Sequence, residues 1–195
     1  DTVYHNSWAY SQTFDANNNI ATATSQYWDG TTWILYSKTL YSYNSSNQMT
    51  SKIMQSWGGS SWQPVSKNVY SYNISGNLET DVYHTWDTLT LAFVAASQKT
   101  YYYDLMNRMI NETDQNLTGS PVYTYQWAYT YADSNVLTIA YNVWDGSGWA
   151  NNNLVTNAYD SSDNRTSQLF QYWDAMTSAY VNSSLDLYSN FTSNH

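Results

Sequence analysis

The chain has 195 residues, a net charge of −9, ten tryptophans, 21 tyrosines and no cysteine. The acidic surplus repels nucleic acid, whose binding depends on cationic contacts to phosphates, and the absence of cysteine excludes disulfides and thiolate chemistry. No run of 18 apolar residues occurs, so the sequence predicts no transmembrane segment. Tyrosine and tryptophan supply the apolar area that a low content of aliphatic residues leaves out.

The tryptophans recur at a fixed spacing. Trp28, Trp57 and Trp86 are 29 residues apart, Trp144 follows after twice that distance, and Trp173 after 29 more. A fixed period of this length is typical of a stack of small supersecondary units that cannot bury a core alone. The sequence therefore predicts one repeat array over residues 1–195. Its parts are a half repeat at 1–14, repeats at about 15–43, 44–72, 73–103, 104–131, 132–159 and 160–188, and a remnant at 189–195.

Each repeat reads, in chain order, as two strands and two turns. The clearest copy opens with a polar turn at 44–47 and continues in a strand from about Met49 to Trp57. A second turn follows, spelled Trp-Asp-Gly-x-x-Trp at 28–33 and 144–149, where Asp-Gly is a strong hairpin signal. A second strand then ends in a Tyr-x-Tyr pair. Only the segment 117–121, which replaces the Trp-bearing turn of the fourth repeat, is expected to be irregular.

Tryptophans and tyrosines are expected at opposite ends of the strands. The two tryptophans that flank a turn should face each other as cross-strand partners, and equivalent residues of successive repeats should lie roughly 9–10 Å apart. The predicted structural ladder consists of Trp28, Trp33, Trp57, Trp62, Trp86, Trp144, Trp149 and Trp173, with Tyr43, Tyr72, Tyr103, Tyr131 and Tyr159 at the other edge.

The predicted fold class is all-β, an antiparallel meander of about 13 strands. Open twisted sheets rarely exceed about 10 strands without curling or splitting. We therefore expect a coiled, solenoid-like array whose interior is filled by the aromatic side chains, with a closed barrel or a two-layer sandwich as alternatives. Neither end of the array carries an obvious polar cap, and an uncapped strand edge can pair with another chain. This predicts head-to-tail self-association into filaments.

The pattern Tyr-x-Tyr-Asp/Asn-x-x-Gly/Asn-Asn, best seen at 70–78, together with Trp-Asp-Gly-x-x-Trp at 28–33, resembles tandem repeats of large secreted proteins from Bacteroidota-type bacteria. It is more distantly similar to the Tyr-Asp repeats of Rhs-type shells, although it lacks their arginine after the turn glycine. The resemblance implies an extracellular or cell-surface structural protein and supplies no catalytic residue. Thr2 and Thr88 also resemble the Asp-Ser/Thr-apolar O-glycosylation motif of those bacteria.

Other chemistry is sparse. His5, His84 and His195 are isolated, and the two glutamates, Glu79 and Glu112, do not form a recurring acid pair. No enzyme activity and no cofactor are predicted, while the Asp/Asn turns at 15–19 and 160–164 leave Ca²⁺ as a lesser alternative. Possible N-glycosylation sites are Asn44, Asn73, Asn111, Asn116, Asn164, Asn182 and Asn190.

Two functions remain after these exclusions. The leading prediction is a structural subunit or repeat segment of an extracellular bacterial filament or surface adhesin, whose principal partner is another copy of the chain. The alternative is a glycan-binding module, because exposed tryptophan and tyrosine rings can stack on sugars.

Overall fold

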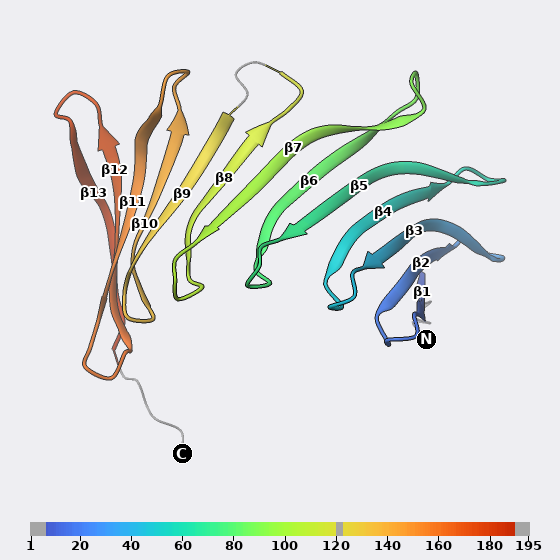
Figure 1. The fold of residues 1–195 in the computed structure, drawn as a ribbon, viewed down its shortest axis with the longest axis horizontal. Coiled ribbons are helices and arrows are strands. Elements are labelled where there is room, and N and C mark those ends of the chain that lie inside the picture. The colour runs from blue at the N-terminus through green and yellow to red at the C-terminus, as the bar shows by residue number, and fades with distance from the viewer. Residues whose placement is uncertain (1–6, 120–122, 190–195) are drawn as a thin grey trace. The chain divides into compact units, whose positions relative to one another are not determined.

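The structure, a computed structural model, describes residues 7–119 and 123–189 and is all-β in that part of the chain (Figure 1). Some predicted features lie outside the described residues: the glycosylation sites Thr2 and Asn190, the remnant after residue 189, and residues 120–121 of the expected irregular segment. The strands are β1 (Trp8–Phe14), β2 (Ile20–Trp28), β3 (Trp33–Tyr43), β4 (Met49–Trp57), β5 (Trp62–Tyr72), β6 (Leu78–Asp87), β7 (Ala92–Tyr103), β8 (Met109–Asn116), β9 (Tyr123–Ala132), β10 (Asn135–Trp144), β11 (Trp149–Tyr159), β12 (Arg165–Asp174) and β13 (Ala179–Leu187).

The 13 strands follow one another in the sheet in the same order as in the sequence, from β1 to β13. This confirms the predicted antiparallel meander. The sheet is open, because β1 and β13 are its first and last described strands, so the closed barrel is not formed. The contacts divide the chain into two compact units, residues 1–98 and 99–195, with the boundary inside β7. None of the described residues forms a helix that could cross a membrane.

Five of the turns at the tyrosine end of the strands share one local structure. In the first, the Asp15 carboxylate accepts the backbone N–H groups of Asn17 and Asn19 at 2.9 and 2.8 Å, and Asn18 takes a left-handed conformation with φ 63°. The adjoining register shift is typical of a three-residue hairpin loop closed by a bulge. Asn44, Asn73, Asp104 and Asp160 accept the same pair of N–H groups in the other four turns.

A second bulge recurs near the middle of several hairpins. Ser25 pairs with Ser37 while Gln26 pairs with Leu35, so Tyr36 is an extra residue between them. The equivalent extra residues are Val65, Asn152 and Ser183. Such a bulge bends the strand and changes the direction in which its side chain points.

The predicted aromatic interior does not form. No hydrophobic side chain in the described part of the chain is buried, and 23 large hydrophobic residues there are exposed, among them Tyr10 at 78%. The physical reason is the strand pairing. Each strand pairs with its neighbours in sequence, so the strands of each unit form one layer and no second layer covers their side chains. Stabilisation therefore comes from backbone ladders and from contacts between neighbouring strands.

Candidate functional site

Aromatic pairs close the strand ends at the second set of turns. Trp28 lies opposite Trp33, and their ring centroids are 5.4 Å apart at an interplanar angle of 62°. Trp57 and Trp62 are 5.1 Å apart at 65°, and the pair formed by Trp144 and Trp149 has the same edge-to-face geometry at 5.3 Å. Edge-to-face pairs of this kind contribute about 0.5–1.5 kcal/mol beyond the area they cover.

Two further aromatic pairs were not predicted from the sequence. Trp86 contacts Phe93 at 5.0 Å and Trp173 contacts Tyr180 at 5.1 Å, both edge-to-face. Their turns are two residues longer than Trp-Asp-Gly-x-x-Trp and share the spelling Trp-Asp-x-x-Thr-x-Ala-aromatic. That second recurring motif was the signal available for finding Phe93 and Tyr180.

The tyrosines at the other end of the strands form hydrogen bonds to the main chain. The Tyr72 hydroxyl donates to the Met49 carbonyl at 2.8 Å, and burial raises the pKa of this tyrosine. The same bond connects Tyr43 to Ile20, Tyr131 to Met109 and Tyr159 to Val136, at 2.6–3.1 Å. Tyr103 ends β7, and burial raises its pKa as well. Four tyrosines thus join the two strands of a hairpin, and in three of them, Tyr43, Tyr72 and Tyr159, the bond lies at the end opposite a Trp-bearing turn.

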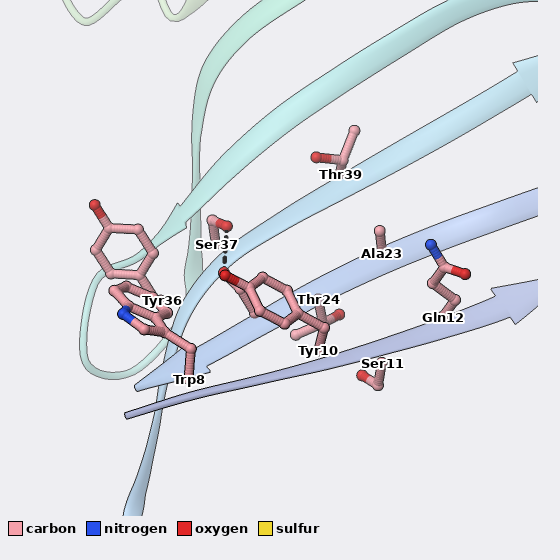
Figure 2. Close-up of a pocket in the computed structure, with 10 residues that line it drawn as sticks. Trp8, Tyr10, Ser11, Gln12, Ala23, Thr24, Tyr36, Ser37 and Thr39 are labelled. Atoms are coloured by element: carbon pink, nitrogen blue, oxygen red, sulfur yellow. Dashed lines mark hydrogen bonds between the residues drawn. The ribbon is translucent and has the colours of Figure 1, made fainter. Parts of the chain in front are cut away.

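A depression with a volume of about 390 Å³ lies on the face of β1, β2 and β3. Its walls are aromatic: the rings of Trp8 and Tyr36 are 5.1 Å apart, and Tyr10 stands beside them with 78% of its surface exposed. The floor is small and polar, because Ser25 and Ser37 occupy it and share a 2.6 Å hydrogen bond. Figure 2 shows the lining side chains, with labels on Trp8, Tyr10, Ser11, Gln12, Ala23, Thr24, Tyr36, Ser37 and Thr39.

The bulge in β3 creates one wall of this depression. Neighbouring side chains of a regular strand point to opposite faces, yet the Tyr36 ring contacts Trp8 and Tyr27, which lie on the same face as Ser37. None of these three aromatic residues was among the predicted site residues. The sequence offered no direct signal for them, because the position of a bulge depends on the register between two strands.

The equivalent place in residues 99–195 is filled. Tyr125 and Trp127 of β9 stand where Trp8 and Tyr10 stand in β1, and Tyr141 takes the position of Ser25. Tyr141 stacks on Tyr125 at 5.4 Å and contacts Trp127 at 5.1 Å. A small residue at position 25, in place of a tyrosine, therefore leaves the depression open.

The aspartates of both kinds of turn bind backbone N–H groups. The Asp29 carboxylate accepts the N–H groups of Thr32 and Thr31, and these bonds hold its pKa below its usual value. Hydrogen bonds from Asn19 likewise hold the pKa of Asp15 below its usual value. These oxygens are already used by the turn, and the described residues contain no cluster of acidic and histidine side chains suited to a metal ion.

The predicted glycosylation sites lie in different surroundings. Thr88 and Asn182 are exposed, whereas Asn44 uses its amide oxygen to hold its own turn and its amide nitrogen to bond Gln48. The Asn111 amide oxygen is buried without a hydrogen-bond partner. Thr88 in the β6–β7 turn is thus more accessible than Asn44 or Asn111. The remaining described sites are Asn73, Asn116 and Asn164, each next to or within a turn.

In the described part of the chain, the acidic and histidine side chains form no cluster of three or more suited to a shared site. His84 is half-buried, with Nδ1 3.1 Å from the Val82 carbonyl. Glu112 accepts a 2.6 Å bond from Lys99, and this bond raises the pKa of the lysine. Each of these groups is therefore engaged within its own part of the sheet.

No model of a known protein family matches the chain, and no curated protein matches it. Among solved structures, a DUF3836 family protein from Bacteroides vulgatus is similar over 47% of this chain and 92% of its own length, with 22% identity and a TM-score of 0.42. A DUF3836 family protein from Parabacteroides distasonis is similar over 54% of this chain and 88% of its own, with 16% identity and a TM-score of 0.33. The TcdB2-TccC3-TEV structure covers 88% of this chain with 11% of its own, at 11% identity and a TM-score of 0.28. These similarities are too weak to assign a function.

Proposed function

We propose that this chain is a structural segment of an extracellular bacterial fibre or surface adhesin, in which copies join through the edges of their sheets. The observation that carries the proposal is the way the sheet is stabilised. The aromatic pairs beside the Trp-bearing turns and the tyrosine bonds connect neighbouring strands, the polar turns are held by bonds within each turn, and the described residues contain no buried hydrophobic side chain. A sheet of this kind can be lengthened by further hairpins without redesign of a core.

The outer strands provide the edges for such joining. β13 pairs with β12 alone in the described sheet, and the Tyr188 N–H donates to the Thr166 carbonyl at 2.9 Å. Because the N–H groups of an antiparallel strand alternate in direction, that of Leu187 points away from β12. Leu187 is also 75% exposed. A strand of a second copy can pair there through main-chain hydrogen bonds.

The test uses light scattering and negative-stain microscopy of the purified chain. Filaments are expected, and Leu187→Pro should abolish them because proline removes the outward donor without touching the β12–β13 ladder. Leu187→Ala keeps that donor and is the matched control, which should still assemble. Circular dichroism verifies that both variants remain folded. A monodisperse monomer at high concentration, or equal assembly by the two variants, would contradict edge-to-edge joining.

A further inference from the structure

We propose that the depression on β1–β3 is a binding site for a neutral oligosaccharide, with its sugar ring placed against Trp8, Tyr10 and Tyr36. The depression is built from side chains of three strands, and its volume of about 390 Å³ falls within the range of small-ligand pockets. This inference is independent of the edge-to-edge assembly proposed above, because the site lies on the face of the sheet.

The chemistry of the lining indicates a neutral ligand with both apolar and hydroxyl groups. Among the residues that the structure describes, no aspartate, glutamate, lysine or arginine lines the depression, although the chain has a net charge of −9. The exposed rings of Tyr10 and Tyr36 offer flat apolar surfaces for the C–H face of a pyranose. Gln12 and the hydroxyls of Ser37 and Thr39 are available at the floor and far end for sugar hydroxyls.

Two other ligand classes fit this geometry less well. A quaternary ammonium group needs rings arranged around an empty centre, but Trp8, Tyr27 and Tyr36 contact one another at 5.1–6.3 Å and leave no such centre. A purely apolar ligand would bury the paired hydroxyls of Ser25 and Ser37 and the Gln12 amide against groups that cannot hydrogen-bond. Under this proposal, the glycan-binding role that the sequence leaves as an alternative belongs to the β1–β3 depression.

The chain itself supplies the variant that closes the site. Tyr141 occupies the position of Ser25 in the other half of the chain and fills the equivalent space by stacking on Tyr125. Ser25→Tyr should therefore fill the depression while keeping a side chain that this sheet position accepts. Phe170 occupies the same position in the last hairpin and does not line the depression, so Phe170→Tyr is the matched control.

The experiment is isothermal titration of the full chain with cellotetraose, maltotetraose, mannotetraose and tetra-N-acetylchitotetraose, and with choline as a cation probe. At least one oligosaccharide should bind at concentrations up to about 5 mM. Ser25→Tyr should weaken that binding at least about tenfold, whereas Phe170→Tyr should leave it unchanged. Tyr36→Ala should also weaken it, because it removes one aromatic wall.

Four results would overturn the proposal. The first two are that none of the four sugars binds and that choline alone binds. The other two are that the two tyrosine substitutions have equal effects on sugar binding, and that Ser25→Tyr abolishes self-association of the chain but leaves sugar binding unchanged. Thermal unfolding of every variant verifies that a lost affinity is not a lost fold. Binding that survives Leu187→Pro would also show that the site does not require assembly.

Discussion

The edge-to-face pair of Trp57 and Trp62 should stabilise the β4–β5 hairpin measurably. The two rings are 5.1 Å apart, both side chains are half-buried, and Lys38 Nζ lies 5.9 Å from the Trp62 ring. Complete removal of a core tryptophan costs about 3–5 kcal/mol, and about half of that, roughly 2 kcal/mol, is expected where only part of the ring is covered. Trp62→Ala should therefore lower Tm by about 4–8 °C in a chain of this size.

The pairwise contribution can be separated by a double-mutant cycle with Trp57→Ala, Trp62→Ala and the double variant. The coupling free energy of unfolding is expected to be about 0.5–1.5 kcal/mol, measured by differential scanning calorimetry. Trp62→Phe should cost less than about 1 kcal/mol, because Phe93 already occupies the equivalent place opposite Trp86. A coupling below about 0.3 kcal/mol would refute the view that the pairs stabilise the hairpins beyond the area they cover.

Three further predictions concern the turns and the tyrosine bonds. The Ser147 and Gly148 N–H groups lower the pKa of Asp145, so its contribution to stability is present above its unfolded pKa of 3.8 and is lost as the pH falls through the lower folded value. Asp145→Asn should therefore flatten the acid dependence of the urea midpoint, and an unchanged dependence would contradict this. Tyr72→Phe removes the bond to Met49 and should cost about 0.5–1.5 kcal/mol of unfolding free energy in calorimetry, whereas no loss would show that the bond adds nothing. Gly146→Ala should lower the free energy of unfolding by about 1 kcal/mol, because Gly146 has φ 100°. Gly148 has equally open space around it but no positive φ, so Gly148→Ala should not destabilise the chain. Equal effects of the two substitutions would exclude backbone strain as the cause.

Strand boundaries and turns could be predicted from the sequence because they depend on local chemistry. β4 begins at Met49 and ends at Trp57, as predicted, since a polar turn precedes the strand and Gly58 follows it. Asn44 and Asp29 hold their turns through bonds to N–H groups two to four residues along the chain. The order of the strands follows from the same short connections, which leave a meander as the simplest path.

The β1–β3 depression and the missing core were decided only by the tertiary structure. Tyr36 joins Trp8 because the register between β2 and β3 inserts a bulge there, and no property of Tyr36 itself indicates that register. Whether a residue is buried likewise depends on what covers the sheet face, and a 29-residue period is compatible with a filled interior as well as with a single layer. The floor is open because position 25 holds a serine where the equivalent position 141 holds a tyrosine. Only the strand pairing shows that these two positions are equivalent.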